Sequence, residues 1–348
     1  MTARPATTDV RRGSDFADLC REVRAADLLG RKPLHYAMRA ACTVSLLLGI
    51  CYLFARLGAS WYQLLVAAGL GVAFTQIAFL GHDAGHQQVF SARRANDLMG
   101  LVVGNLVIGM SYGWWVEEHT RHHIYPNYED KDPDIGEGVL AFTAEQARTR
   151  SGPVTRFIAR HQAALFFPLL TLEGLNLRVL SAQALLAPRG RRRRRVEVVF
   201  ILMHVIGYLT AVFLVLPVGM ALAFVAVHQA VFGVYMGCSF APNHKGMPTV
   251  APGEKVDFLR RQVLTARNVR GGRITDFMLG GLNYQVEHHL FPSMPRPNLR
   301  HVQPIVRAHC QALNIPYTEA SLIGSYAAAL RYLHAVGEPL RQQARTRS

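Results

Sequence analysis

Cysteine is scarce in this sequence and follows no pattern. The 348 residues include five cysteines, and no two of them form a CxxC pair. An odd number without paired spacing indicates neither a disulfide framework nor a thiolate metal site. We therefore expect these cysteines to be reduced and mostly structural.

Acidic residues are also few. The chain has 23 Asp and Glu against 38 Lys and Arg, a formal net charge of +15. Such a surplus can indicate nucleic-acid binding. Here, however, the basic residues lie beside long apolar segments, as in the run "RGRRRRR" at 189–195. Basic residues in that position interact with anionic lipid, so we expect membrane lipid as a partner and no nucleic acid.

Charged residues are absent from two long stretches, Leu57 to Gly81 and Val198 to His244, if histidine is counted as neutral. A bilayer core takes about 20 apolar residues per helix. The second stretch is long enough for two spans, with "LPVG" at 216–219 as the turn between them. The sequence therefore predicts an all-α integral membrane protein with two transmembrane hairpins below a helical cap. Its four transmembrane helices are expected at about 38–56, 61–81, 198–216 and 219–240.

The distribution of charge around these spans predicts their orientation. The hairpin tips near 57–60 and 217–219 contain no Lys or Arg, whereas basic residues flank the other ends. The positive-inside rule places those other ends in the cytoplasm, and no apolar signal-peptide core precedes them. We expect a multi-pass protein of the cytoplasmic membrane, with cytoplasmic segments at 1–35 and 311–348 and a membrane domain at 36–310.

Two further apolar stretches are interrupted by other residue types. The stretch 98–116 contains several glycines and an asparagine, and 166–186 contains Glu173 and Arg178. Arginines on both sides of 98–116 favour the same compartment for its two ends. We therefore expect a re-entrant or buried element at 98–116 and an interfacial helix at 166–186.

Histidine is clustered rather than scattered. "HDAGH", "HTRHH" and "QVEHH" contain histidines at helical spacings, which place them on one face, and "APNHKG" ends the fourth span. Under the topology above, all of these lie at the cytoplasmic ends of the spans. The candidate metal ligands are His82, His86, His119, His122, His123, His244, His288 and His289. His204 and His228, inside the spans, are expected to bond to neighbouring helices.

Eight imidazoles are enough for two metal ions with positions left open, since one structural zinc takes four ligands. Imidazole without cysteine suits iron, copper, zinc or nickel. A ligating histidine also needs an acceptor for its other nitrogen. Asp83, Glu118 and Glu287 each adjoin a clustered histidine and are candidates for that role.

"GHDAGH", "EEHTRHH" and "GGLNYQVEHHLFP" resemble the three histidine boxes of integral-membrane fatty acid desaturases. The resemblance covers about residues 60–310. The residues within the boxes are most similar to those of bacterial, in particular actinobacterial, acyl-CoA and acyl-lipid desaturases. It implies a cytoplasmic cap in which the eight histidines hold two iron ions. It also implies that O2 is consumed as a cis double bond is inserted into an acyl-CoA or acyl-lipid chain.

The sequence departs from the family pattern in two respects. The third box opens with Gln285, as in front-end desaturases, so this residue is either a ligand or a residue that orients a ligand. Front-end enzymes usually carry a fused haem domain, but no "HPGG" haem motif occurs here. We therefore expect electrons from a separate ferredoxin- or cytochrome-type donor with its reductase.

The acyl chain must reach the metal from the bilayer, and we expect Phe74, Phe79, Trp114 and Trp115 to line its path. A hydroxylase or ketolase on the same scaffold is the nearest alternative, because it would share the boxes. A metal transporter would also gather histidines, but near the middle of the spans, whereas these lie at one interface.

The orientation can be tested by cysteine labelling from outside in a background without the native cysteines. Gly58→Cys and Val218→Cys, at the hairpin tips, should react with an impermeant reagent. Asp130→Cys and Arg270→Cys should not react until the membrane is permeabilised. Reaction of Asp130→Cys from outside would instead show that 98–116 crosses the membrane.

Overall fold

The computed structural model describes residues 14–188 and 193–346. These residues are mostly helical, with one pair of short parallel strands, β1 (Asn268–Arg270) and β2 (Glu319–Ser321). Part of the arginine run at 189–195 and of the N-terminal segment 1–35 lies outside the described ranges, so their expected roles stay predictions.

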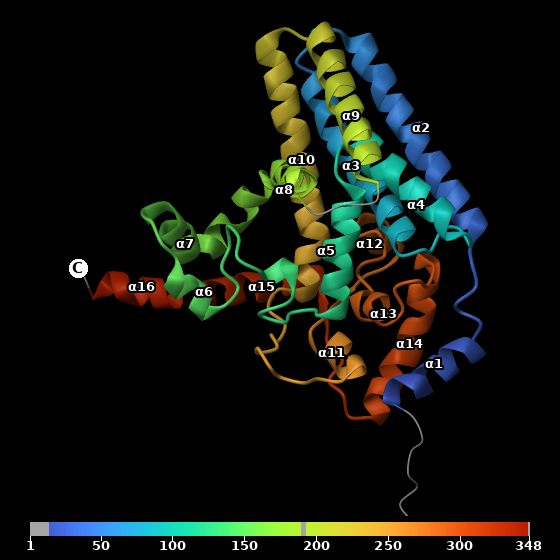
Figure 1. The fold of residues 1–348 in the computed structure, drawn as a ribbon, viewed down its shortest axis with the longest axis vertical. Coiled ribbons are helices and arrows are strands. Elements are labelled where there is room, and N and C mark those ends of the chain that lie inside the picture. The colour runs from blue at the N-terminus through green and yellow to red at the C-terminus, as the bar shows by residue number, and fades with distance from the viewer. Residues whose placement is uncertain (1–13, 189–192, 347–348) are drawn as a thin grey trace, which may run out of the picture.

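Four helices are long and apolar enough to cross a membrane. They are α2 (Pro33–Leu57), α3 (Gln63–Gly85), α9 (Arg194–Val215) and α10 (Val218–His244). Figure 1 shows them together above the remaining helices, and α2–α3 and α9–α10 form two hairpins. Gly58 provides the first turn with a left-handed φ of 54°, and Pro217 follows α9 at the second. The expected fold class, four apolar spans with a helical cap, is confirmed.

Two pairs of helices are together apolar enough to cross a membrane, but each pair is sharply bent. The first joins α4 (Arg93–Leu101) and the π-helix η1 (Val102–Ile108) to α5 (Tyr112–Ile124), with a bend of 114°. The second joins α7 (Pro153–Leu170) to α8 (Glu173–Leu186), with a bend of 88°. The first bend falls where Gly109 adopts a left-handed φ of 80°. Each pair is either a broken span or a re-entrant element, and we keep the re-entrant interpretation of 98–116 as a prediction.

Glycines allow α10 to approach its neighbours closely. A Cβ on Gly71 of α3 would lie 2.9 Å from the backbone nitrogen of Phe232, and a Cβ on Gly233 would lie 2.5 Å from the carbonyl oxygen of Leu170. Small residues of this kind permit tight contact between membrane helices. The close packing of α3 against α10 brings the ends of these two helices, which carry His82, His86 and His244, to the same region.

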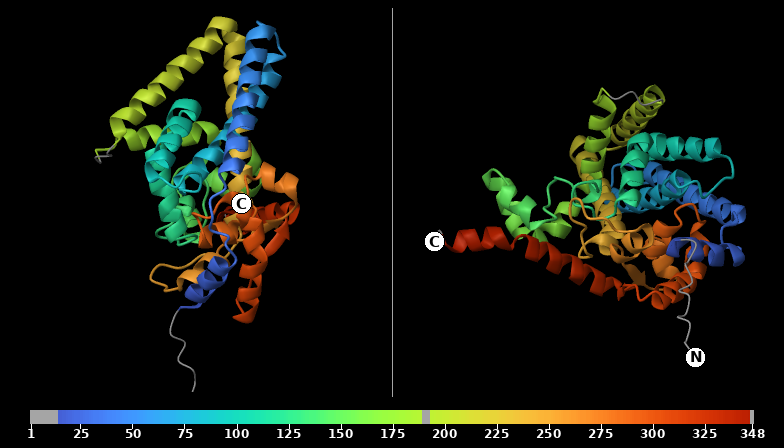
Figure 2. Two further views of the ribbon diagram at one scale, coloured as in Figure 1. Left: turned by 90° about the vertical axis from the view of Figure 1, so that its right-hand side faces the viewer. Right: turned by 60° about the horizontal axis from the view of Figure 1, so that its bottom comes forward.

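The cap packs beneath these ends (Figures 1 and 2). It includes α1 (Asp15–Ala25), α11 (Phe258–Leu264), α12 (Arg273–Met278), α13 (Gln285–Leu290) and α14 (Arg296–Ala312). Leu19 and Val23 of the amphipathic α1 share one core with Val286, Leu290 and Val302. This core fixes α13 on both sides of its histidine pair. The other elements are η2 (Pro133–Ile135), α6 (Ala144–Thr149), α15 (Leu322–Val336) and α16 (Glu338–Arg345).

Candidate metal centre

All eight clustered histidines meet where the ends of α3 and α10 contact α5 and α13. Seven of them form two sets, in each of which one ring nitrogen per residue lies within 4.8 Å of the others. The first set is His82, His86, His119 and His288, and the second is His122, His244 and His289. Six of the eight are buried, while His86 and His119 are half-buried. Residues separated by more than 200 positions in the sequence therefore build one site.

His123 lies between the two sets. Its Nε2 is 3.1 Å from Nε2 of His119, in the first set. Its ring centroid is 4.2 Å from that of His289, in the second set. His123 can therefore contribute to either set.

The adjacent pair in α13 divides between the two sets. His288 belongs to the first and His289 to the second, and their rings stand at 84° to each other. Consecutive residues in an α-helix point about 100° apart. One short helix consequently supplies both sets, which accounts for two neighbouring histidines in this segment.

Hydrogen bonds at Nδ1 fix the tautomers of several histidines. His122 Nδ1 lies 3.0 Å from Oδ1 of Asp132, and His244 Nδ1 lies 3.0 Å from the carbonyl oxygen of Thr265. His289 Nδ1 lies 3.0 Å from Oε1 of Gln262, whose Nε2 donates to the His123 carbonyl. A carboxylate or carbonyl oxygen can only accept, so Nδ1 carries a proton in each of these rings and Nε2 is the nitrogen that can bind a metal ion.

Several Nε2 atoms are left for a metal ion. His122 Nε2 and His244 Nε2 face each other at 3.3 Å, a separation that either a shared proton or a metal ion can bridge. Nε2 of His82, His288 and His289 is buried without a hydrogen-bond partner among the described residues. Orphaned buried acceptors of this kind call for an unobserved ligand. The donor set therefore fits metal ions that bind imidazole nitrogen.

The electrostatics of the site keep all but one of these imidazoles neutral. Burial lowers the pKa of His288 and of His289 well below the usual histidine value, and neighbouring histidines lower it further. Asp132 shows the opposite balance, because His122 outweighs the effect of burial and lowers the pKa of this carboxyl to about 2. His122 is the exception: burial lowers its pKa, but Asp134 and Asp132 outweigh burial and raise the pKa to about 9. At neutral pH the metal-free site thus combines neutral imidazoles with one His122–Asp132 ion pair, and a metal ion at His122 must displace a proton from Nε2.

The comparison with known proteins agrees with this geometry. The model of the family described as "Fatty acid desaturase" matches residues 59–321. The chain belongs to the fatty acid desaturase family. It is 31% identical over 332 residues to a "Delta(8)-fatty-acid desaturase" of Helianthus annuus, covering 92% of this chain and 72% of the relative.

Two other relatives show similar identity. A "Delta(5) fatty acid desaturase fat-4" of Caenorhabditis elegans is 32% identical over 314 residues, 87% of this chain and 69% of the relative. An "Acyl-lipid (9-3)-desaturase" of Physcomitrium patens is 32% identical over 292 residues, 81% of this chain and 55% of the relative. These three relatives are eukaryotic. The expected similarity to bacterial desaturases in particular is therefore not shown, although the family is.

The predicted enzyme class is confirmed by this membership. The protein is a fatty acid desaturase, an O2-dependent oxidoreductase that requires a fatty acyl substrate and an electron donor. The buried histidine sets are consistent with the di-iron site of such an enzyme.

Of the three acidic residues proposed as histidine partners, only Asp83 contacts a histidine in the desaturase. Its Oδ1 lies 3.3 Å from Nδ1 of His82. Glu118 instead pairs with Arg121, and Glu287 accepts hydrogen bonds from Asn268 Nδ2 and Tyr317 Oη. The partner role expected for Glu118 and Glu287 is therefore corrected. Adjacency in a helix was misleading, because neighbouring side chains diverge.

The acceptors that the sequence analysis missed come from loops and from α11. Asp132 lies ten positions after His122, in the acidic segment "EDKDPD", which offers a weak signal. The left-handed conformation of Asn127, with φ of 56°, belongs to the turn that brings this segment back to His122. Gln262 and the carbonyl of Thr265 carry no signal in the sequence, because their role depends on how α11 packs.

The aromatic residues expected along the acyl path lie in different places. Trp115 stacks on His119 at 4.6 Å between ring centroids and lies 5.6 Å from His82. Phe79 is buried under Gly280 of the third box. Phe74 and Trp114 belong to the core between the spans. Trp115 is therefore the aromatic residue of this group that borders the histidines directly.

The two histidines inside the spans bond to neighbouring helices, as expected. His204 Nδ1 lies 3.2 Å from the carbonyl oxygen of Leu106 in η1. His228 Nδ1 lies 2.9 Å from Tyr208 Oη of α9. Both side chains therefore connect helices of the membrane region and take no part in the histidine sets.

Gln285 lies against the second set. Its Nε2 is 3.0 Å from Nε2 of His244, and its Oε1 accepts a hydrogen bond from Asn243 Nδ2 at 3.1 Å. Asn243 Nδ2 also faces the carbonyl oxygens of Ser239 and Leu282, which fixes the orientation of both amides. Gln285 thus presents an N–H, and not an oxygen, to the histidines.

The Asp132–His122 contact generates a test. Asp132→Asn can place an amide N–H against Nδ1 of His122, which favours the tautomer with the proton on Nε2 and removes a lone pair. Such changes behind a ligand typically weaken metal affinity about 10–100-fold. Titration of metal-depleted protein with Fe(II) should show this loss. The exposed neighbour variant Asp130→Asn should bind as the wild type does, and equal affinity of the two variants would contradict the assigned tautomer.

Proposed function

We propose that the two histidine sets hold two iron ions, with His82, His86, His119 and His288 around one and His122, His244 and His289 around the other. His123 would complete either set. The buried Nε2 atoms of His82, His288 and His289, which have no hydrogen-bond partner among the described residues, carry this proposal, and the family membership indicates iron. Imidazole nitrogen is a suitable donor for iron.

The reaction that we propose is the O2-dependent insertion of a cis double bond into the acyl chain of a phospholipid or of acyl-CoA. Bound iron would supply the oxidising power to remove hydrogen from an unactivated methylene group, which side chains alone do not have. The protein contributes orientation and exclusion of water. The acceptors at Nδ1 hold the imidazole rings, and Trp115 covers the first set on the side of α5.

We further propose that the metal centre faces the cytoplasm and receives electrons from a separate carrier. The basic residues that flank the spans support this orientation. Desaturation consumes electrons, and we infer a ferredoxin- or cytochrome-type donor with its reductase as their source. A basic cytoplasmic face attracts acidic partners and phosphate-bearing substrates.

Fatty-acid profiling of a host that expresses the chain tests the reaction. The wild type should produce unsaturated acyl chains, and hydroxylated or keto products would identify a different reaction on the same scaffold. His288→Ala and His289→Ala should each abolish the product, because each removes one iron ligand. His334→Ala, an exposed histidine outside the site, is the matched control and should leave the profile unchanged.

Gln285 should behave differently from its neighbours. Gln285→Ala removes an N–H that orients the second set but no metal ligand, so we expect roughly a tenfold loss of product. Gln285→His supplies a ring at the same position and should retain more activity than Gln285→Ala. Complete loss in Gln285→Ala together with loss of iron would show that the amide is itself a ligand.

A further inference from the structure

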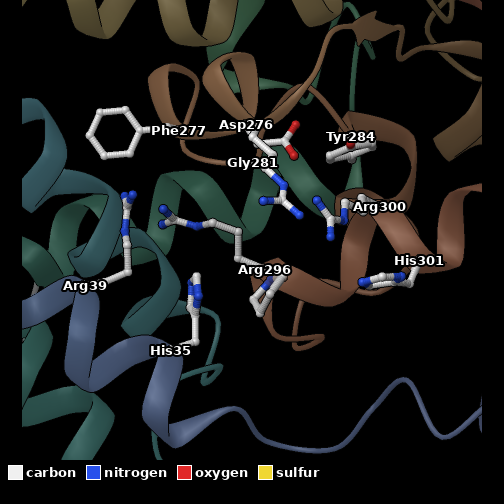
Figure 3. A pocket seen from close by; sticks show the side chains of 11 residues that line it. His35, Arg39, Asp276, Phe277, Gly281, Tyr284, Arg296, Arg300 and His301 are labelled. Carbon is white, nitrogen blue, oxygen red and sulfur yellow. The ribbon is translucent and has the colours of Figure 1, made fainter.

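A basic pocket lies beside the metal centre, between the start of α2 and the cap helices α12 and α14. Its volume is about 310 Å³, which is at the lower end of the range for small-molecule sites. Four arginines and one aspartate line it: Arg39, Arg273, Arg296, Arg300 and Asp276. Figure 3 shows Arg39, Arg296 and Arg300 around this space, with Asp276 and Tyr284 on one side of it.

The positive charge of this pocket is not balanced by the chain. The Asp276 carboxylate accepts a hydrogen bond from Asn283 Nδ2 at 2.9 Å and forms no ion pair with any described arginine. Arg273 and Arg300 make no side-chain hydrogen bond or ion pair with any residue that the structure describes. Their guanidinium groups are thus available to a ligand.

Arg39 is half-buried without a carboxylate. Its guanidinium group donates to Oε1 of Gln76 at 3.1 Å and lies 5.1 Å from the ring centroid of Phe277. Its Nε is buried and has no hydrogen-bond partner in the described ranges. A charge removed from water is costly unless it is paired, so this guanidinium group indicates an anion that none of the described residues provides.

Arg296 connects the pocket with the first histidine set. Its side chain is 8% exposed and pairs with Asp83 at 2.5 Å, and Asp83 contacts His82. Nε and Nη1 of Arg296 remain without partners among the described residues. The Asp83 carboxylate thus contacts both the buried Arg296 and the candidate ligand His82. An anion in the pocket would stabilise the positive charge of Arg296, which Asp83 shares with His82.

The start of α14 reinforces the preference for an anion. Its first turn contains no acidic residue and begins with Arg296, followed one turn later by Arg300. The N-terminus of a helix carries a partial positive charge and favours anions. Two arginines at this position therefore add to the helix dipole instead of offsetting it.

The two helices that meet at the pocket also carry exposed apolar side chains. Leu34 and Met38 each directly precede a lining residue of α2 and are 73% and 59% exposed, and Ile274 and Phe277 of α12 are 81% and 51% exposed. Exposed apolar side chains on helices that also contribute arginines to a pocket match the boundary between lipid tails and headgroups. The ligand that fits this combination has a phosphate group attached to apolar chains.

We propose that this pocket binds the phosphate group of a phospholipid and so positions the substrate of the desaturase. The inference rests on the proposed function for its link to catalysis, although binding itself requires neither iron nor turnover. Tyr284, which lines the pocket, directly precedes Gln285 of the third box. A bound headgroup would therefore lie next to the segment that supplies both histidine sets. Coenzyme A also carries phosphates, but the exposed apolar side chains on both helices favour a lipid.

Binding of short-chain probes to the detergent-purified full chain tests this proposal. The probes are dioctanoyl phosphatidylglycerol, dioctanoyl phosphatidylcholine, dioctanoylglycerol, which lacks phosphate, and coenzyme A. The pocket variant is Arg273→Gln/Arg300→Gln. The control, Arg148→Gln/Arg331→Gln, removes the same charge from exposed positions elsewhere. Iron content is measured in each preparation, so that failure of the metal site is detected separately.

We expect the wild type to bind both phospholipids more tightly than dioctanoylglycerol. The pocket variant should lose roughly tenfold in affinity for them, as expected when charge-assisted hydrogen bonds are removed. The control should bind as the wild type does. Displacement of the phospholipid by coenzyme A, with the same loss in the pocket variant, would support the phosphate site but identify a thioester as the source. Equal binding by the pocket variant and the control, or equal binding of dioctanoylglycerol and phospholipid, would overturn the proposal whatever the iron content.

Discussion

The gathering of eight imidazoles in one largely buried space is the constraint on which the rest of this structure depends. His122 Nε2 and His244 Nε2 face each other at 3.3 Å, and their Nδ1 atoms are committed to Asp132 and Thr265. Without a metal ion, His122 carries a second proton at neutral pH, because Asp134 and Asp132 raise its pKa to about 9. A metal ion between the two rings would replace that proton, so metal binding releases a proton and is coupled to local stability.

The fold meets this constraint by holding the donors in place before a metal arrives. Glycines let α10 pack tightly on α3 and α8, which fixes the ends of the spans that carry three of the histidines. The cap core, to which Val286 and Leu290 belong, fixes α13. Positioning by helices and by the residues behind each ligand is what a precise metal site requires. Arg296 and Asp83 extend the same network from the first set to the basic pocket at the start of α2.

Sequence patterns predicted the parts of this molecule that depend on local spacing. Charge-free stretches indicated the four apolar helices, and the i, i+3 and i+4 spacings indicated the eight histidines that meet. The patterns could not indicate what lies behind each ring. Asp132 reaches His122 through a turn, and Gln262 reaches His289 from a separate helix, whereas Glu118 and Glu287, adjacent in sequence, point elsewhere. The basic pocket was missed for the same reason, since Arg39 is more than 200 residues before Arg273 in the sequence.

The central claim is that the two histidine sets hold two iron ions, and metal analysis tests it most directly. Protein purified in detergent, depleted of metal and reconstituted with Fe(II) should retain about two iron ions per chain after removal of excess metal. Retention of a single zinc ion and no iron under the same treatment would contradict the account.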